Sequence, residues 1–408
     1  MKTSRTYPYV IISEKGERFL RGGHVWVYDA EITAESTTPQ DGEIVDVLSK
    51  KGRYLGSGFF NSHSRIRVRI LSKNANDRFD DAFFVRRLQY AVAYRKTVMG
   101  SDFACCRLIF GEADGLPGLT VDRFGDILVA QVLSLGIEQR KTMIFEALVQ
   151  ILRDMGEQIT ALYERNDVAL REKEGLQQTV GFFPGTGLLT DASGVTEITE
   201  NGIRYAVDYI HGQKTGFFLD QKYNRLAAGR LAAGKTVLDC FTHTGAFALN
   251  CAKAGAKRVT AVDISQDAID LTKANAARNG LSNVDFLCAN VFDLLTKLYE
   301  ENDRTYDYII LDPPAFTKSS STVKNAERGY KEINMKAMKL LPRGGYLATC
   351  SCSHFMTDDL FRKMLRSAAA DAGVELRQIE ARQQSPDHPI LWNVPETDYL
   401  KFYLFQVV

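Results

Sequence analysis

The chain has 408 residues, too many for one hydrophobic core, which predicts two or three domains. Its 45% hydrophobic and 25% charged residues are typical of an ordinary soluble globular protein. A net charge of +1 does not by itself indicate a nucleic-acid-binding protein, although residues 1–75 carry 12 Lys and Arg against 8 Asp and Glu.

Several classes of protein are disfavoured by the residue pattern. The opening MKTSRTYPYVII lacks the apolar core of a signal peptide, and no run approaches the roughly 18 to 20 apolar residues of a membrane span. The seven cysteines, including Cys240, Cys251, Cys288 and Cys350, lie mostly in apolar segments, which argues against a disulfide framework. No CxxC pair or His/Cys cluster with metal spacing is present. We therefore expect a protein of the reducing cytoplasm, with no membrane segment and no metal.

Residues 1–75 consist of short apolar and β-branched runs separated by glycine-marked turns, the pattern of a small β-barrel. The expected strands are Tyr9–Ser13, Glu43–Leu48, Tyr54–Phe60 and Ile66–Leu71.

Two alternating patterns in this barrel carry a possible binding function. Arg65, Arg67 and Arg69 alternate along one strand and so share one face, and Trp26 alternates with His24 and Tyr28 in the same way. A basic face beside aromatic rings suits RNA, because phosphates pair with arginine and unstacked bases lie on aromatic planes. A half-buried aromatic strand with a solvated arginine face is the alternative.

Residues 76–190 predict a small α+β unit. Its expected elements are helices at 76–98 and Glu138–Met155, a hairpin of Leu119–Phe124 and Ile127–Leu133, and a strand at Ile159–Glu164. The adjacent Cys105 and Cys106 fit core or partly exposed positions. No chemistry is visible in this block, which could be a connector or a substrate platform.

A second hairpin is expected at Ile198–Tyr209 around Asn201-Gly202. The stretch from Gly212 to Gln221 then precedes a helix at Lys222–Leu231. Its small and polar residues suit either a loop over a ligand or an ordinary domain linker.

The unit Thr236–Asp263 predicts a strand, a tight turn, a helix and a second strand, as in one half of a Rossmann-like sheet. The turn has only Gly245, whereas dinucleotide folds need several glycines around a pyrophosphate. Asp239 suits a cofactor with an ammonium group, and Asp263, about 24 residues later, is placed to bind a ribose. Together they favour S-adenosylmethionine (SAM), although any α/β domain with acidic strand ends is the alternative.

Three later strand ends carry polar groups. Asn290 follows the third strand, where it could bind the adenine edge, and Asp312 is held by Pro313-Pro314 after an apolar strand at Tyr306–Leu311. Cys352 lies between two serines after the strand Tyr346–Cys350, where a nucleophile could reach a cleft. His354 and His388 are conceivable proton carriers, but solvent or packing roles suit each better.

These residues carry a resemblance to a known family. Thr236–Phe247, Leu311–Phe316 and Ser351–Ser353 resemble motifs I, IV and VI of class I methyltransferases. With Gln213–Gln221 and the tail 384–389, QSPDHP, they are similar to the RlmI-type enzymes, which methylate carbon 5 of a cytosine in 23S-type ribosomal RNA.

The resemblance implies a PUA-like RNA-binding β-barrel at 1–75, an α+β domain of EEHEE type at 76–190 and a Rossmann-like methyltransferase domain at 191–408. It implies Cys352 as the nucleophile and Asp312 as the group that holds the base, with an unpaired or flipped cytosine as the target. The residues implied to bind SAM are Gln221, Asp239, Phe241, Thr244, Gly245, Asp263, Ile264, Asn290, Asp312 and Pro313. A homodimer is left open.

The chain departs from wider patterns at two positions. Ala315 stands where other RNA cytosine-5 methyltransferases have a second cysteine that helps to release the product, and Asn290 stands where relatives commonly have Asp. An RNA guanine or adenine N-methyltransferase would share the carboxylate–Pro–Pro signature without needing Cys352. A catalytically inactive ribosome-assembly factor is a further alternative, and a dehydrogenase is disfavoured by the turn.

Overall fold

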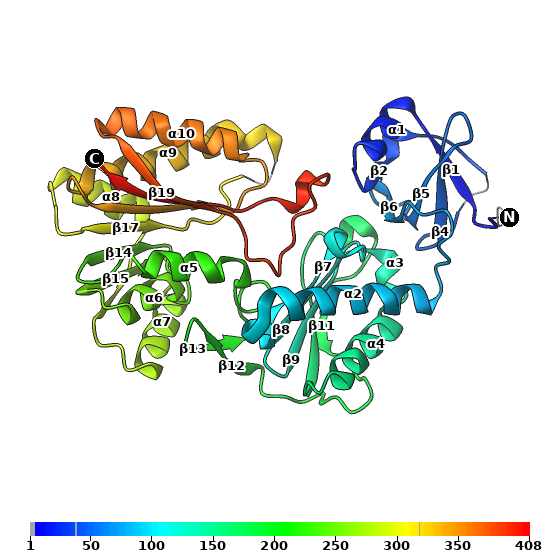
Figure 1. Ribbon diagram of the computed structural model, residues 1–408, viewed down its shortest axis with the longest axis horizontal. Coiled ribbons are helices and arrows are strands. Elements are labelled where there is room, and N and C mark those ends of the chain that lie inside the picture. The colour runs from blue at the N-terminus through cyan, green and yellow to red at the C-terminus, as the bar shows by residue number, and fades with distance from the viewer. Residues whose placement is uncertain (1–4, 37–38, 318) are drawn as a thin grey trace. The chain divides into compact units, whose positions relative to one another are not determined.

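The computed structural model describes residues 5–36, 39–317 and 319–408, and the chain divides into two compact units. The first unit comprises Met1–Glu197, Val207–Leu219 and Pro386–Thr397, and the second comprises Ile198–Ala206, Asp220–Ser385 and Asp398–Val408. Figure 1 labels most of the helices and strands of both. No helix in the described ranges has the length and apolar character needed to cross a membrane.

The N-terminal part of the first unit is a six-stranded sheet in the order β2-β6-β5-β4-β1-β3. Its elements are β1 (Tyr9–Ile12), α1 (Glu14–Arg21), β2 (Trp26–Tyr28), β3 (Ile32–Glu35), β4 (Ile44–Ser49), β5 (Tyr54–Phe60) and β6 (Ile66–Ser72). The four predicted strands are confirmed. Helix α1 was not anticipated because it is short and mostly polar; it begins where Ser13 Oγ accepts a hydrogen bond from the Gly16 amide.

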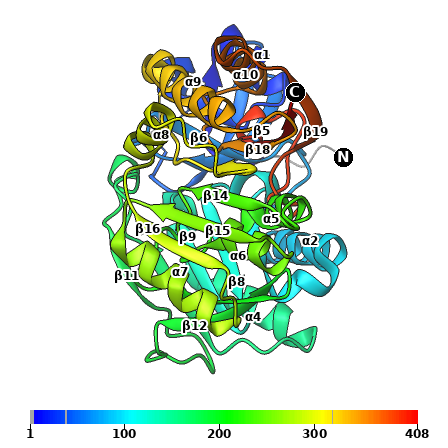
Figure 2. The ribbon, with the colours of Figure 1, turned by 90° about the vertical axis from the view of Figure 1, so that its left-hand side faces the viewer.

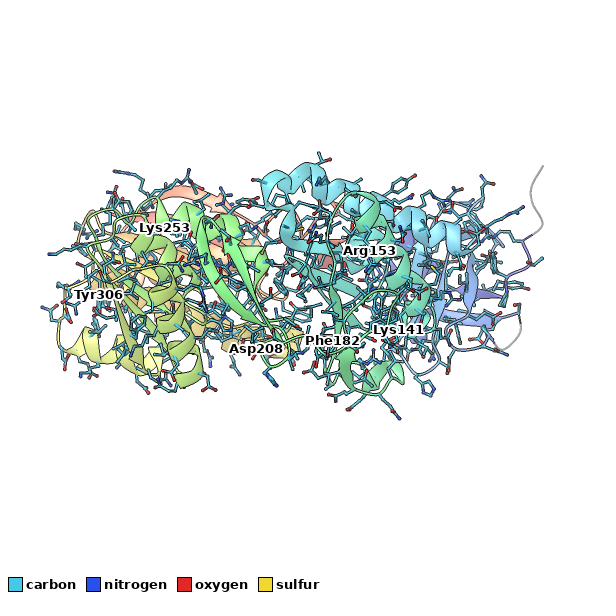
Figure 3. All side chains as sticks on the ribbon, turned by 90° about the horizontal axis from the view of Figure 1, so that it is seen from below. Lys141, Arg153, Phe182, Asp208, Lys253 and Tyr306 are labelled. Atoms are coloured by element: carbon cyan, nitrogen blue, oxygen red, sulfur yellow. The ribbon has the colours of Figure 1, made fainter. Side chains whose placement is uncertain are left out.

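The central part of the first unit has a five-stranded sheet in the order β11-β10-β9-β8-β7, with α2 and α4 packed against each other. Its elements are α2 (Asp81–Met99), β7 (Cys105–Phe110), β8 (Leu119–Phe124), β9 (Ile127–Val132), α3 (Leu135–Glu138), α4 (Lys141–Asp154), β10 (Ala161–Asn166) and β11 (Thr179–Phe182). The EEHEE order runs from β8 to β11, with β7 added in front. Near the start of α4, Lys141 Nζ donates to the Glu164 carboxylate, and near its end Arg153 donates to the Thr186 and Gly187 carbonyls. Figure 3 labels both side chains.

A hairpin of β12 (Val195–Glu200) and β13 (Ile203–Asp208) follows, turning at Asn201-Gly202 as predicted. The second unit then builds a seven-stranded sheet in the order β16-β15-β14-β17-β18-β20-β19. Its strands are β14 (Thr236–Cys240), β15 (Arg258–Asp263), β16 (Val284–Cys288), β17 (Tyr308–Leu311), β18 (Tyr346–Ser351), β19 (Leu376–Arg382) and β20 (Lys401–Val407). Its helices are α5 (Lys222–Gly229), α6 (Ala246–Lys253), α7 (Gln266–Arg278), α8 (Val291–Glu300), α9 (Val323–Leu340) and α10 (Asp358–Ala372).

The first five strands of this sheet are parallel; β20 pairs antiparallel with β18, and β19 pairs antiparallel with β20. Figure 2 shows β14, β15 and β16 beside α6 and α7. The chain runs outward from β14 through β15 to β16 and then returns to β17 on the other side of β14. The predicted doubly wound sheet is confirmed. Its switch point lies between β14 and β17, where ligands bind beyond the carboxyl ends of the strands.

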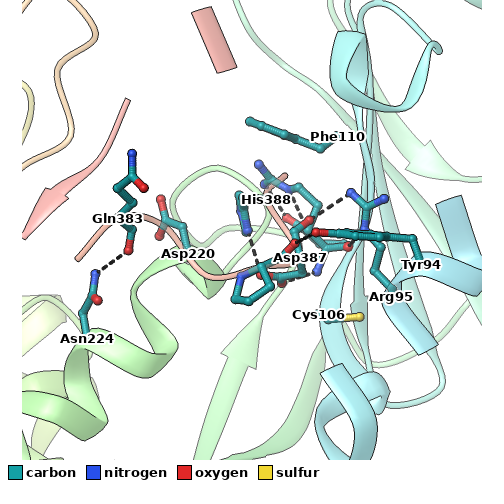
Figure 4. Close-up of polar contacts among 12 residues, drawn as sticks. Tyr94, Arg95, Cys106, Phe110, Asp220, Asn224, Gln383, Asp387 and His388 are labelled. Carbon is teal, nitrogen blue, oxygen red and sulfur yellow. Dashed lines mark hydrogen bonds and ion pairs between the residues drawn. The ribbon is translucent and has the colours of Figure 1, made fainter. Parts of the chain in front are cut away.

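The segment between β19 and β20 differs from the predicted domain division. Residues 386–397 interrupt the methyltransferase sheet in the sequence, yet they belong to the first unit. There the Asp387 carboxylate accepts a hydrogen bond from the Arg107 amide. The backbone carbonyl of Asp387 accepts another from the buried guanidinium of Arg95 (Figure 4). The division at residues 75 and 190 remains a prediction.

Candidate active site

The turn after β14 has a strained backbone. Phe241 and His243 adopt left-handed conformations, with φ of 65° and 51°, which non-glycine residues seldom do. Gly245 has φ of 83°, and a Cβ there would lie 2.5 Å from Thr272 Cγ2. The small-residue turn is therefore as tight as the sequence predicted, and Gly245 leaves no room for a side chain. Strain of this kind is found where a backbone is shaped around a ligand.

Asp239, at the carboxyl end of β14, has one oxygen in use and one available. Its side chain is fully buried, and Oδ2 accepts hydrogen bonds from Thr242 Oγ1 at 2.6 Å and from the Ala248 amide at 2.9 Å. Oδ1 has no hydrogen-bond partner among the described residues. Removal from water raises the pKa of this carboxyl to about 7. A buried, unsatisfied carboxylate oxygen fits an ammonium group, as expected for the amino-acid end of SAM.

Asp263 and Asn290 end the next two strand connections. The Asp263 carboxylate accepts hydrogen bonds from the His243 amide at 2.9 Å and the Ser265 amide at 3.0 Å, so it orders the turn itself. Ile264 beside it is 69% exposed. Asn290 is exposed and caps α8, because its Oδ1 accepts the Phe292 amide at 2.9 Å.

Asp312 follows β17 on the other side of the switch point and is hydrogen-bonded by Gln221, whose Nε2 donates to Oδ1 at 3.0 Å. Burial raises the pKa of Asp312 to about 6; the charge of Asp220 adds to the rise, and Arg225 opposes it. Gln221, expected only to contact the cofactor, therefore also tunes this carboxylate.

The amide of Gln221 is itself oriented by a chain of hydrogen bonds. Asn224 Nδ2 donates to Gln221 Oε1 at 2.7 Å and to the Gln383 carbonyl at 3.2 Å, the latter drawn in Figure 4. Arg382 Nε donates in turn to Asn224 Oδ1 at 3.1 Å. This chain points the amino group of Gln221, rather than its oxygen, at Asp312.

Cys352 lies directly after β18, the parallel neighbour of β17. Leu311 pairs with Thr349, so the next residue of each strand, Asp312 and Cys350, lie side by side, and the Cys350 thiol faces the carboxylate. Cys352 is the second residue after Cys350 and the first beyond the end of β18. Ser353 Oγ donates to the Thr317 carbonyl at 3.0 Å, which ties the end of β18 to the loop after the prolines. The structure thus brings Asp312 and Cys352 to one edge of the sheet.

The exposure of the cysteines separates Cys352 from most of the others. Cys352 is half-buried, whereas Cys105, Cys106, Cys240, Cys251 and Cys350 are buried. Cys288, although it lies in an apolar segment of the sequence, is exposed, because β16 is the edge strand of the sheet in the described chain.

The two candidate histidines behave as the sequence suggested. His354 is exposed. His388 is 2% exposed in the first unit, where Nδ1 lies 3.0 Å from Asp387 Oδ1 and the ring packs against Phe110 (Figure 4). His388 therefore has a packing role. In the ranges that the structure describes, no group of three or more His, Cys, Asp or Glu side chains could hold a metal ion.

The predicted basic face of the barrel is corrected at Arg69. This side chain is 8% exposed, and its guanidinium donates to Glu112 at 3.1 Å and Glu174 at 2.8 Å. Trp26 Nε1 also donates to Glu112, at 2.9 Å. Arg69 therefore serves the packing of the first unit. Arg65 is exposed and Arg67 half-buried, and RNA binding by these two and Trp26 remains a prediction.

Sequence reasoning missed Lys401 altogether. It begins β20 opposite Ser351 and is only 6% exposed, and its Nζ donates to the Ser353 and Tyr399 carbonyls at 2.6 and 2.8 Å. The alternation of residues 398–407 indicated a closing strand, but nothing in it indicated which strand end this lysine would meet.

Comparisons with known proteins agree with this arrangement. Residues 165–406 match the family of S-adenosylmethionine-dependent methyltransferases, and residues 10–73 match the PUA-like domain. The chain is 40% identical to ribosomal RNA large subunit methyltransferase I of Klebsiella pneumoniae (strain 342) over 409 residues, which cover 100% of both chains. It is 39% identical to the protein of that name from Escherichia coli (strain SMS-3-5 / SECEC) over 402 residues, 98% of this chain and 99% of that one.

Solved structures support the fold. A SAM-dependent methyltransferase from Streptococcus mutans has a TM-score of 0.82 at 23% identity and covers 98% of this chain and 100% of its own. A methyltransferase structure that contains SAH matches with the same TM-score and coverage at 22% identity.

The doubly wound sheet, the tight turn and the acidic strand ends define a SAM-dependent methyltransferase that carries a PUA-like domain, and its cofactor is S-adenosylmethionine. Within that class, the chain belongs to the family of ribosomal RNA large subunit methyltransferase I.

Proposed function

We propose that this protein methylates carbon 5 of a cytosine in large-subunit ribosomal RNA through a covalent bond between Cys352 and the base. The observation that carries the proposal is a half-buried cysteine at the end of β18 beside a carboxyl group at the end of β17. The names of the full-length relatives supply the class of RNA.

The cofactor would be held along the first three strands. Asp239 Oδ1 would accept from the ammonium group, Asp263 would bind the ribose, and Ile264 and Asn290 would border the adenine. The turn of Phe241, Thr244 and Gly245 would let the backbone approach closely, and Gln221 and Pro313 would close the methyl-donor end. Bound SAM supplies a methyl group that its sulfonium activates.

Cys352 is proposed to make carbon 5 nucleophilic. Carbon 5 of cytosine is too weak a nucleophile to take a methyl group directly. A thiolate that adds to carbon 6 turns the ring into an enamine and divides one difficult step into easier ones. After methylation, a base removes the carbon 5 proton, and the carbon–sulfur bond breaks to release Cys352. Ala315 offers no group for that proton transfer.

Asp312 is proposed to hold the base while the sulfur adds. A carboxyl group whose pKa is about 6 is still partly protonated at neutral pH. In its protonated form it can donate to ring nitrogen 3 and accept from the exocyclic amine, which stabilises the charge that develops as the thiolate adds. A cytosine inside a paired stem cannot reach such a group, so the target would be unpaired or flipped out, with the PUA-like domain binding the surrounding RNA.

The proposal is tested by mass mapping of modified nucleosides in ribosomal RNA. The RNA comes from a deletion strain and from the same strain supplied with the wild-type gene, the Cys352→Ala gene or the Cys288→Ala gene. Cys288 is the matched control because it is also accessible but lies at the edge of the sheet. We expect one 5-methylcytidine in large-subunit RNA that Cys288→Ala retains and Cys352→Ala loses.

Two results would contradict the proposal. A methylated guanine or adenine that survives Cys352→Ala would indicate an N-methyltransferase. No change in modification, together with no SAM binding in calorimetry, would indicate an assembly factor.

A further inference from the structure

We propose that Lys401 is a positioning residue whose ammonium group holds Cys352 in the thiolate form. The inference rests on the proposed role of Cys352 as the nucleophile. Its test, however, measures the ionisation of the thiol and needs neither RNA nor methyl transfer, so the two can fail separately.

The backbone brings Lys401 to the end of β18. Strands β18 and β20 are antiparallel, and Ser351, the residue before Cys352, pairs with Lys401. Lys401 Nζ donates at 2.6 Å to the carbonyl of Ser353, the residue after Cys352. The residues directly before and after Cys352 in the sequence, Ser351 and Ser353, therefore both contact Lys401. Such pairing fixes the lysine more firmly than a surface ion pair would.

The lysine is buried, and among the residues that the structure describes its ammonium group donates to carbonyl oxygens and to no carboxylate. Its Nζ donates to two carbonyl oxygens, those of Ser353 and Tyr399, and an ammonium has three donors. A buried cation is costly unless an anion lies near it. Burial lowers the pKa of Lys401 to about 8. Among the charges that oppose this decrease, that of Cys352 has the largest effect. At pH 7 Lys401 is therefore mainly an ammonium, and the charge of a Cys352 thiolate stabilises it more than that of Asp398 or Asp358.

The other charged groups around the pair are weaker partners. Asp398 and Asp358 also favour the Lys401 cation. Asp358 is exposed and accepts a hydrogen bond from Tyr403 Oη, and Asp398 accepts one from Gln383 Nε2 at 3.0 Å. On the side of Cys352, the titratable neighbours are Tyr330, Cys350 and Asp312. Burial raises the pKa of Tyr330 and Cys350, which keeps both neutral at pH 7. The pKa of Asp312 is raised to about 6, so its carboxylate opposes a Cys352 thiolate, and the Lys401 charge has to outweigh it. Lys401 is thus a cation held at the end of β18, next to Cys352.

The consequence is a reactive sulfur at neutral pH. A free thiol with a pKa of about 8.5 is only about 3% thiolate at pH 7. A decrease of one to two units in pKa raises that fraction to about a quarter to three quarters. This gain of roughly tenfold in nucleophile concentration is what Lys401 supplies, without touching the substrate.

The test is the rate of iodoacetamide alkylation of the full-length protein without RNA, from pH 5.5 to 9.5, with each cysteine followed by peptide mass spectrometry. Exposed Cys288 in the same molecule is the internal control. We expect the alkylation midpoint of wild-type Cys352 to lie at least one pH unit below that of Cys288. Lys401→Gln, which keeps a hydrogen-bond donor but no charge, should slow Cys352 at pH 7 about tenfold and leave Cys288 unchanged. Lys401→Arg, which keeps the charge, should restore most of the rate.

In the wild-type protein, an alkylation midpoint of Cys352 at or above the pKa of a free thiol would overturn the inference. A Cys352 midpoint that is the same in Lys401→Gln as in the wild type would also overturn it. If Lys401→Gln does not fold, Lys401→Met takes its place, and the wild-type midpoint still decides against the inference if it is not lowered. A lowered, Lys401-dependent midpoint in a protein that makes no 5-methylcytidine would refute the proposed function and leave this inference standing.

Discussion

Replacing Asp239 by Asn should stabilise the fold at alkaline pH while weakening cofactor binding. In the folded protein the pKa of Asp239 is about 7, against an ordinary value of 3.8. The folded state therefore holds a proton that the unfolded chain has released between about pH 4 and 7, and stability falls as pH rises through that window. Asn has no proton to lose. The unfolding free energy of Asp239→Asn relative to the wild type should thus increase by about 2.5 kcal/mol between pH 5 and pH 8.

The same substitution removes the negative charge proposed for the cofactor's ammonium group. Hydrogen bonds to charged groups contribute about 1.5 to 3 kcal/mol, so SAH affinity should fall at least tenfold.

Urea unfolding at pH 5, 6, 7 and 8 measures the stability change, and calorimetric titration with SAH measures the binding. Asp270→Asn is the control, because that aspartate is exposed on α7 and its carboxylate accepts a hydrogen bond from the Gln266 side chain on the same helix. It should change neither quantity appreciably. A stability difference that stays flat with pH would refute the buried state of the Asp239 carboxyl. Unchanged SAH affinity would refute its role in the cofactor site.

Three further changes test other parts of the site. Gly245→Ala should destabilise the fold by about 2 kcal/mol more than Gly255→Ala in urea unfolding, because both glycines have positive φ but only the first lacks room for a Cβ; equal costs would contradict the tight turn. Gln221→Met removes the hydrogen bond that lowers the pKa of Asp312. The decline of the single-turnover methylation rate at alkaline pH, measured at saturating SAM, should therefore move to higher pH. A decline at the same or a lower pH would argue against a protonated Asp312. Asn290→Asp keeps the helix cap and adds a second acceptor oxygen for the adenine amine, so SAH should bind about threefold to tenfold tighter in calorimetry; weaker binding would place the adenine elsewhere.

The sequence could predict the site to the extent that strand ends determine it. Parallel strands all finish at one edge of a sheet, so Asp239, Asp263, Asp312 and Cys352 could be expected together once the strands were recognised. The apolar runs that mark those strands are strong because both faces of a parallel sheet are covered. Gly245 was likewise predictable from the short small-residue turn.

The remaining features depend on which segments meet, which periodicity does not reveal. Alternation placed Arg69 on one face of β6 but could not show that Glu112 and Glu174, far along the chain, would cover it. The exposure of Cys288 follows from β16 being an edge strand, which depends on the strand order. Lys401 gains its neighbours only when β20 inserts antiparallel beside β18.

The most direct test of the central claim is trapping of the protein on large-subunit RNA transcribed with 5-fluorocytidine in the presence of SAM. Fluorine at carbon 5 cannot be removed as a proton is, so a base that is attacked at carbon 6 should stay bound to the enzyme. We predict a complex that survives denaturant, whose digestion yields a peptide with the nucleotide on Cys352, and no such complex with Cys352→Ala. Methylation of ordinary RNA without any trapped complex, or an adduct on another residue, would contradict the account.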